Sequence, residues 1–283
     1  MTPEISIDAF EIFANGLDHP ECLAFDRHGD LWAGGEAGQI YRISPDGKVQ
    51  LVTTLDSFCA GLAFSLEDEL FVCNPALGIV RVTVGGEFSV FASHVGKHKI
   101  ACANYGLFDS SGNYYVTDSG QWKKSNGYLL RFRPDGKGEI LAGPLGYANG
   151  LALTVDEKNL FMVESNTDSV FRFEIRADGL VSAPEIYATD CGRFPDGLTL
   201  DAEGNLYVCC YASDEIWRIS PSRKKIYSLG IATRFSSAVR QTWLLAEKIL
   251  TNFILRISRE LQLPAQKSDA KGSRSLTKKR QKN

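Results

Sequence analysis

A short apolar phrase recurs along most of this chain. Its leucines are Leu23, Leu62, Leu107, Leu151 and Leu198, which lie 39 to 47 residues apart. A polar turn follows the phrase, and in most copies it contains glycine, as in Asp201-Ala-Glu-Gly204. A second apolar run, such as Leu206-Tyr207-Val208, then begins. Two apolar runs joined by such a turn are typical of a β-hairpin.

Each copy continues with two further strands. A run that alternates polar and apolar residues comes next, as in Glu215-Ile-Trp-Arg-Ile219, and a Pro-Asp-Gly turn at 45–47 and at 134–136 leads to a fourth strand. Repeats of about 45 residues with four short antiparallel strands are typical of propeller blades. Such a sheet buries both of its faces only when neighbouring sheets stack around an axis. The pattern therefore predicts an all-β propeller with five recognisable blades.

The C-terminal part of the chain departs from this pattern. A sixth phrase is expected near residue 243, but residues 242–257 contain no turn signal, and their apolar residues recur at helical spacing. Two interpretations stay open: a divergent or helical end that packs on the ring, or an altered reading frame after about Lys225 that leaves the last blade disrupted. We expect a β-propeller over 1–225, a divergent segment that could form a helix over 226–266, and a basic disordered tail over 267–283.

The charge distribution narrows the choice of partners. The last 17 residues hold seven Lys or Arg and one Asp, a net charge of +6, which leaves −9 for residues 1–266 of a chain whose total is −3. An acidic body argues against nucleic acid as the partner of the folded part, because phosphate binding needs a basic face. The tail itself could serve nuclear localisation or nucleic-acid binding, although a solvated end is the simpler interpretation.

The expected location is cytoplasmic. The chain has seven cysteines, an odd number, and they lie inside apolar runs where cysteine acts as a small buried hydrophobe. The N-terminal residues have no signal-peptide pattern, and no window is apolar enough for a membrane span. We therefore expect no membrane partner, and a monomer or weak homo-oligomer.

The residues that open the phrases point to a shared site. The first strand of every blade lines the central channel of a propeller, so equivalent positions form a ring around one mouth. These positions are Glu21, Ala60, Tyr105, Asn149 and Asp196, and Asn104 lies one residue before Tyr105. Carboxylate and amide oxygens that converge on a water-filled channel suit a hard divalent cation such as Ca²⁺, Mg²⁺ or Mn²⁺, whereas Zn²⁺ is less natural without His or Cys.

A purely structural interpretation competes with this one at each position. Asn-Gly and Asp-Gly are ordinary turn dipeptides, so Asn149 or Asp196 alone could simply start a strand. That interpretation gives no reason for oxygen-bearing residues to occupy the same register in separate repeats. The register therefore favours a metal site.

The motifs resemble those of the SMP-30/gluconolactonase/LRE-like family of six-bladed propellers. The resemblance rests on Pro20-Glu21, Asn104 with Gly106, Ala148-Asn149-Gly150-Leu151 and the run from Phe194 to Asp201, and it covers about residues 10–225. It implies a six-bladed ring and one divalent cation, most simply Ca²⁺, with Zn²⁺, Mg²⁺ or Mn²⁺ as alternatives. The resemblance also implies metal ligands at Glu21, Asn149 and Asp196, a general base at Asp196, and hydrolysis of lactones or related esters.

One departure from the family concerns the substrate. The sugar-lactonase members carry Arg-x-Asn-Asp-Gly where this chain has Cys102-Ala103-Asn104-Tyr105-Gly106. The arginine and aspartate that hold a sugar acid are therefore missing, and Tyr105 makes the mouth more apolar. We expect Asn104 and Tyr105 to bind a lactone or ester that is less polar than a sugar lactone.

Two further acids and one alternative function complete the sequence-based picture. Asp118 and Glu164 end the second strands of the third and fourth repeats, so they lie near the same mouth, where they could support the ligands, touch the substrate or face solvent. The chain has no phosphate-binding glycine loop and no Gly-x-Ser-x-Gly motif. The alternative to a hydrolase is a non-catalytic calcium-binding regulator or scaffold.

Overall fold

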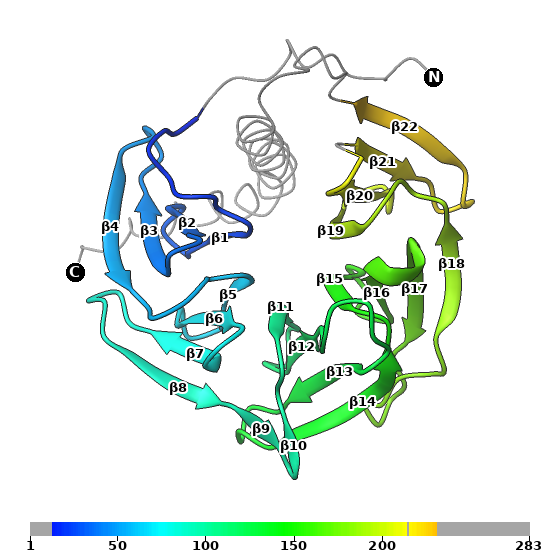
Figure 1. Ribbon diagram of the computed structural model, residues 1–283, viewed down its shortest axis with the longest axis horizontal. Helices are drawn as coiled ribbons and strands as arrows, with labels where there is room; N and C mark the ends of the chain where they lie inside the picture. Colours follow the sequence, from blue (N-terminus) through cyan, green and yellow to red (C-terminus); the bar gives the residue numbers. More distant parts are fainter. Residues whose placement is uncertain (1–12, 214, 231–283) are drawn as a thin grey trace, which may run out of the picture.

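The computed structural model describes residues 13–213 and 215–230, which form five four-stranded antiparallel sheets around one axis (Figure 1). In blade 1 the strands are β1 (Leu23–Phe25), β2 (Leu31–Gly34), β3 (Gln39–Ile43) and β4 (Val49–Thr54). In blade 2 they are β5 (Leu62–Phe64), β6 (Leu70–Asn74), β7 (Gly78–Val82) and β8 (Phe88–Ala92). In blade 3 they are β11 (Ala103–Phe108), β12 (Tyr114–Asp118), β13 (Gly127–Phe132) and β14 (Gly138–Leu145).

The last two described blades follow the same order. Blade 4 contains β15 (Ala148–Leu153), β16 (Asn159–Glu164), β17 (Ser169–Glu174) and β18 (Glu185–Thr189), with a 3₁₀ turn, η2 (Ser165–Thr167), between β16 and β17. Blade 5 contains β19 (Pro195–Leu200), β20 (Leu206–Cys210), β21 (Glu215–Ile219) and β22 (Lys225–Gly230). A small hairpin, β9 (His94–Val95) and β10 (His98–Lys99), connects blades 2 and 3.

This arrangement confirms the predicted all-β propeller of four-stranded blades. The sixth blade, the divergent segment from residue 231 onward and the basic tail at 267–283 lie outside the described residues. Strand β22 runs to Gly230, so the fifth blade extends past residue 225. The part of the chain that the structure describes has no helix long and apolar enough to span a membrane, and the cytoplasmic location stays a prediction.

A repeated turn-and-strand unit explains why each sequence repeat folds into a blade. The residue directly after the first strand has a side-chain oxygen that accepts backbone N–H groups from the turn; these residues are Asp26, Ser65, Asp109, Thr154 and Asp201. The aromatic residue on the second strand stands opposite an arginine on the third; the pairs are Trp32 and Arg42, Phe71 and Arg81, Tyr115 and Arg131, Phe161 and Arg172, Tyr207 and Arg218. The unit fixes the turn and the register of three strands together.

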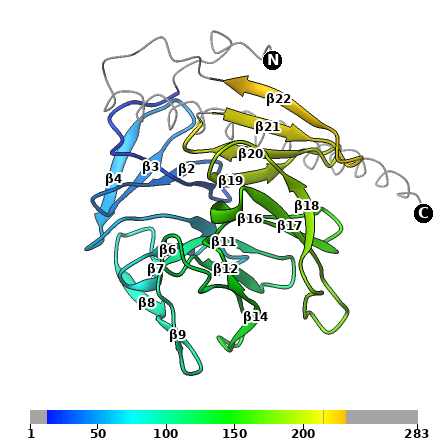
Figure 2. The same cartoon turned by 45° about the vertical axis from the view of Figure 1, so that its right-hand side comes forward.

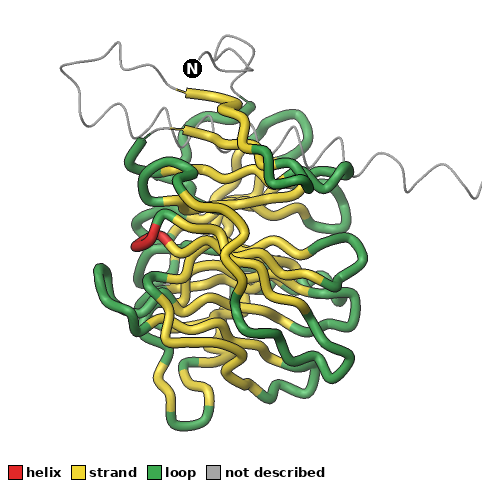
Figure 3. The backbone as a smooth tube through the Cα atoms, turned by 90° about the vertical axis from the view of Figure 1, so that its right-hand side faces the viewer, coloured by secondary structure: helices red, strands yellow, loops and turns green. Residues whose placement is uncertain are grey.

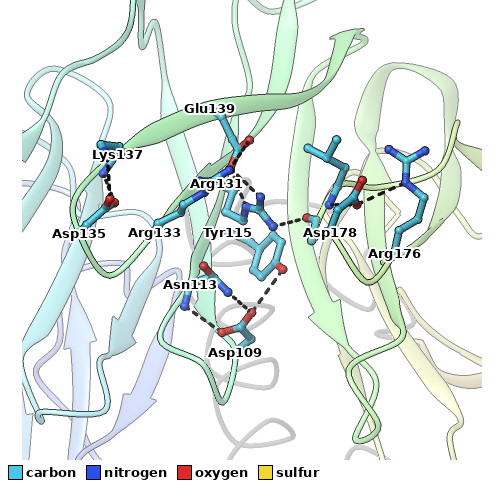
Figure 4. Close-up of polar contacts among 12 residues, drawn as sticks. Asp109, Asn113, Tyr115, Arg131, Arg133, Asp135, Lys137, Glu139, Arg176 and Asp178 are labelled. Atoms are coloured by element: carbon cyan, nitrogen blue, oxygen red, sulfur yellow. Dashed lines mark hydrogen bonds and ion pairs between the residues drawn. The ribbon is translucent and has the colours of Figure 1, made fainter.

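Blade 3 shows the unit in full (Figure 4). Asp109 Oδ1 accepts the backbone N–H of Asn113 at 2.8 Å, and Oδ2 accepts the Tyr115 hydroxyl at 3.3 Å. Arg131 donates to Glu139 on β14 at 2.6 Å and to the carbonyl of Gly179 in blade 4. The buried guanidinium therefore links the outer strand of one blade to a loop of the next.

The hydrophobic core lies between the blades. Four clusters of buried side chains each draw on two consecutive blades, such as Trp32 of blade 1 with Val72 of blade 2 and Val163 of blade 4 with Val208 of blade 5. The blades stack side by side (Figure 2), and the loops gather at the two faces of the ring (Figure 3). The first strands β1, β5, β11, β15 and β19 surround the axis (Figure 1).

Candidate metal and active site

Three of the inner strands carry a bulge where the predicted site residues lie. The register between β11 and β12 shifts between Ala103 and Gly106. The same shift occurs after Ala148 in β15 and after Pro195 in β19. A bulge leaves one extra residue outside the ladder and changes the direction of its side chains. Asn104, Asn149 and Asp196 lie inside these three bulges.

The strand pairing corrects the register that the sequence phrases suggest for blade 3. Alignment on the phrase leucines makes Tyr105 equivalent to Asn149 and Asp196. In the structure Ala103, Ala148 and Pro195 are opposite the last residues of their second strands, so Asn104 is the equivalent residue. The ring at this level therefore consists of Glu21, Ala60, Asn104, Asn149 and Asp196.

All five site residues predicted for ligand or substrate binding line one cavity at the centre of the ring. The cavity has an empty volume of about 480 Å³, and its lining includes Glu21, Asn104, Tyr105, Asn149 and Asp196. Asn104 and Asn149 are buried, whereas Glu21 and Asp196 are half-buried. The cavity thus collects oxygen-bearing side chains from four separate blades.

Asn149 donates a hydrogen bond to the Asp196 carboxylate. Burial raises the pKa of the Asp196 carboxyl to about 6, and a hydrogen bond from Asn149 partly opposes that increase. Asn149 also donates from Nδ2 to Ser165 Oγ at 3.2 Å. Both amide hydrogens then have acceptors, which leaves Oδ1 as the Asn149 atom that can bind a cation.

Two serines that the sequence analysis did not single out fix this part of the site. Ser119 Oγ donates to the carbonyl of Ala148 at 2.6 Å, and Ser165 Oγ donates to the carbonyl of Pro195 at 2.7 Å. Each serine belongs to one blade and holds the next blade at the residue just before a site side chain. Both follow an acid that ends a second strand, and this repeated acid-serine pair is the signal that could have found them.

Asp118 and Glu164 bind the backbone just before the bulged strands β11 and β15. Asp118 is fully buried, accepts the backbone N–H of Cys102 at 2.8 Å and contacts His98 Nε2 at 2.9 Å. Glu164 accepts the backbone N–H of Gly146 and the Thr167 hydroxyl. Both carboxylates bind backbone groups directly ahead of β11 and β15. The solvent-facing interpretation of these two acids is therefore wrong.

Tyr105 forms part of the floor of the cavity. The equivalent residue of β15 is Gly150 and that of β19 is Gly197, so the tyrosine side chain occupies space that these blades leave free. Burial raises the pKa of the Tyr105 hydroxyl. This hydroxyl lies within hydrogen-bonding reach of the Cys22 thiol. Tyr105 packs against core residues of blades 1, 2 and 4.

The residues of this cavity fit a divalent cation. Two carboxylates and two amides form an oxygen-only donor set, which Ca²⁺ prefers. The raised pKa of Asp196 also indicates that the hydrogen bond from Asn149 offsets only part of the cost of burying its negative charge. A cation held by Glu21, Asn149 and Asp196, with Asn104 nearby, would supply that compensation.

A second group of potential ligands lies where the loop ahead of β1 meets the turn between β2 and β3. Ligand atoms of Asp18, His19 and Glu36 are within 4.8 Å of one another. His19 Nδ1 contacts the Glu36 carboxylate, and Asp18 accepts the backbone N–H of Ala37 at 3.1 Å. Their contacts with each other and with the loop explain this group without a cation.

Comparison with known proteins identifies the family. The model of the SMP-30/Gluconolactonase/LRE-like region matches residues 20–239 of the chain. The chain belongs to this family. Lactonase drp35 of Staphylococcus saprophyticus is 32% identical over 223 residues, which are 73% of this chain and 67% of that protein.

Solved structures agree on the fold. A gluconolactonase from Xanthomonas campestris superimposes with a TM-score of 0.70 at 18% identity, covering 78% of this chain and 79% of that one. The calcium-binding protein regucalcin of Agrobacterium tumefaciens gives a TM-score of 0.69 at 16% identity, covering 80% and 79%. At these identities the likeness extends to the propeller fold alone.

Proposed function

We propose that this protein is a divalent-cation-dependent hydrolase of lactones or related esters. The proposal is carried by one observation: oxygen-bearing side chains from four blades line a single cavity at equivalent positions of the repeat. Turn formation gives no reason for that convergence. Membership of a family that includes named lactonases supports the same reaction class.

In this proposal Glu21, Asn149 and Asp196 hold the cation, and Ca²⁺ is the ion that their oxygens suit best. When bound, the cation polarises the substrate carbonyl and stabilises the negative charge that develops on its oxygen. The bulges in β15 and β19 fix Asn149 and Asp196, and the hydroxyls of Ser119 and Ser165 fix the backbone beside these two ligands.

Asp196 serves as the general base. Its carboxylate would help to hold the cation and would take a proton from the water that attacks the carbonyl carbon. In the metal-free protein burial raises the pKa of this carboxyl to about 6, and a bound cation would favour its ionised, proton-accepting form. Asn104 orients the substrate by hydrogen bonding from its buried amide, and Tyr105 packs against the substrate from the floor of the cavity. The sequence motif around Asn104 lacks the charged residues expected for a sugar acid, so we propose a less polar lactone.

Chelation tests the proposal. Purified protein should hydrolyse members of a panel of lactones and aryl esters, lose that activity after dialysis against a chelator, and regain it on addition of Ca²⁺, Mg²⁺, Mn²⁺ or Zn²⁺. The ion that restores the highest rate identifies the cofactor. Hydrolysis that survives complete metal removal would contradict the mechanism. Tight metal binding with no turnover on the whole panel would instead favour the regulator or scaffold alternative.

A further inference from the structure

Three aromatic rings meet on the side of the mouth formed by blades 3, 4 and 5. The Trp122 ring lies 4.8 Å from the Tyr147 ring at an interplanar angle of 88°, and 5.1 Å from the Phe194 ring at 55°. Rings that meet near a right angle form an apolar corner. Trp122 is 46% exposed, so the corner remains open to solvent. The proposed mechanism gives no role to these three side chains.

Two of the rings stand directly beside site residues. Tyr147 lies two residues before Asn149, and Phe194 lies two residues before Asp196. The Tyr147 hydroxyl is within hydrogen-bonding reach of the Cys102 thiol. Two of the three rings therefore belong to the segments that lead directly to Asn149 and Asp196 of the cavity lining.

The backbone holds both residues in an unfavourable conformation. Tyr147 has φ 63° and Phe194 has φ 52°, a left-handed region that bulky side chains rarely adopt. Ser165 N donates to the Tyr147 carbonyl at 3.1 Å, and Phe194 N donates to Asp168 Oδ1 at 2.7 Å. Such strain persists only when surrounding contacts enforce it, and it is concentrated at ligand sites.

Trp122 lies on the loop between β12 and β13 of blade 3. Within this loop Gln121 N donates to Asn126 Oδ1 at 2.9 Å and Lys124 N donates to the Gln121 carbonyl at 3.0 Å. Asn166 of blade 4 donates to the Lys124 carbonyl at 3.2 Å. Contacts within the loop and to the next blade thus keep an exposed tryptophan in place, although exposure of its ring to water is unfavourable.

We propose that Trp122, Tyr147 and Phe194 form a specificity wall for the apolar substituent of the substrate. This inference rests on the proposed function. A lactone or ester whose carbonyl enters the central cavity would place a ring substituent on the side of blades 3 to 5, against the aromatic corner. The wall selects substrates with an alkyl or aryl substituent, because each methylene that leaves water gains binding free energy. Polar sugar lactones gain nothing from the wall.

A chain-length series tests the wall. For γ-lactones with progressively longer alkyl substituents, the wild-type kcat/KM should rise roughly two- to fourfold per methylene until the corner is covered. In Trp122→Ala this increment should shrink toward unity, and Trp122→Phe should restore part of it. Phe88→Ala is the matched control, because Phe88 is similarly exposed, at 44%, on the outer strand of blade 2. It should keep the wild-type increment.

A binding measurement separates failure of the wall from failure of the proposed function. Unreactive cyclic ketones with the same alkyl substituents should bind wild type with affinity that rises with chain length, and Trp122→Ala should flatten that rise. If the ketones show this behaviour but no lactone is hydrolysed, the wall stands and the hydrolase proposal fails. Hydrolysis with an equal chain-length increment in wild type and Trp122→Ala would overturn the wall.

Discussion

At the scale of single residues, the type of aromatic side chain in each repeated unit depends on the residue that directly follows the first strand. Asp26, Asp109 and Asp201 accept hydrogen bonds from the ring N–H or hydroxyl of Trp32, Tyr115 and Tyr207. In the two blades where Ser65 or Thr154 replaces the acid, the aromatic residue is phenylalanine. An aspartate carboxylate has a second oxygen that needs a hydrogen-bond donor, whereas the side chain of Ser or Thr has only one oxygen.

This matching predicts a measurable coupling in blade 3. Tyr115→Phe removes the donor to Asp109 and should lower the free energy of unfolding by about 1 kcal/mol. In an Asp109→Ser background the same substitution creates the Ser-Phe pair found in blade 2. There it should lower the free energy of unfolding clearly less. Urea unfolding of the two single variants and the double variant measures the difference. Equal costs in the two backgrounds would mean that Asp109 and Tyr115 do not interact.

Under the proposed function, the Asp196 carboxyl makes cation binding depend on pH. Its pKa of about 6, raised by burial, lies above the ordinary value of 3.8, so the ionised group destabilises the metal-free fold above pH 6 and this cost disappears as the pH falls toward 4. A cation must displace the proton below pH 6. Affinity should therefore fall roughly tenfold per pH unit below that point and level off above it.

Calorimetric titration between pH 5 and 8 would measure this dependence. Asp196→Asn is the control, because an amide does not titrate and the slope assigned to residue 196 should vanish. Affinity that is independent of pH in wild type would show that Asp196 carries no proton to displace.

At the scale of secondary-structure elements, the sequence predicted the inner strands but not every position within them. Alternating apolar residues and Gly turns are local signals, so the five blades and the register of Asn149 and Asp196 followed from them. The leucine of the blade 3 phrase lies one residue later in the strand pairing, since Leu107 is opposite Tyr115 whereas Ala152 is opposite Phe161, so Asn104 rather than Tyr105 takes the ring position. Ser119 and Trp122 make contacts across blade boundaries. The acid-serine pair marks Ser119 in the sequence, but its partner in the next blade is visible only in the structure.

Close packing of the inner strands predicts a specific sensitivity at Gly150. A Cβ at this position would meet the Asp196 carbonyl at 2.6 Å and the Leu198 nitrogen at 2.9 Å, both backbone atoms of the next blade. Gly150→Ala should therefore push β19 away from β15, lower the melting temperature and weaken cation binding, at a cost of about 1–3 kcal/mol in stability.

Thermal melting and cation titration of Gly150→Ala test this packing argument. Gly85→Ala is the matched control, because the added methyl would meet only Thr83 Oγ1, at 3.7 Å. It should melt and bind like wild type. A Gly150→Ala variant that behaves in the same way would show that β15 and β19 tolerate a wider separation.

At the scale of the whole molecule, the ring brings distant parts of the sequence to one point. Glu21 and Asp196 are separated by most of the described chain, yet both line the central cavity. Each blade supplies one position of the ring, and blade 2 supplies Ala60, which has no ligand atom. The site therefore depends on assembly of the described blades. In the proposed mechanism the two acids have different tasks: Glu21 only holds the cation, whereas Asp196 also takes a proton.

The most direct test of the account compares Glu21→Gln with Asp196→Asn at increasing cation concentration. Each substitution removes one charge and keeps an oxygen, so both should weaken cation binding without unfolding the ring. At saturating cation, Glu21→Gln should regain much of the wild-type rate of lactone hydrolysis. Asp196→Asn should remain slower by roughly 10²- to 10⁴-fold, because an amide cannot accept the proton. Equal recovery of the two variants would contradict the assignment of Asp196 as the general base.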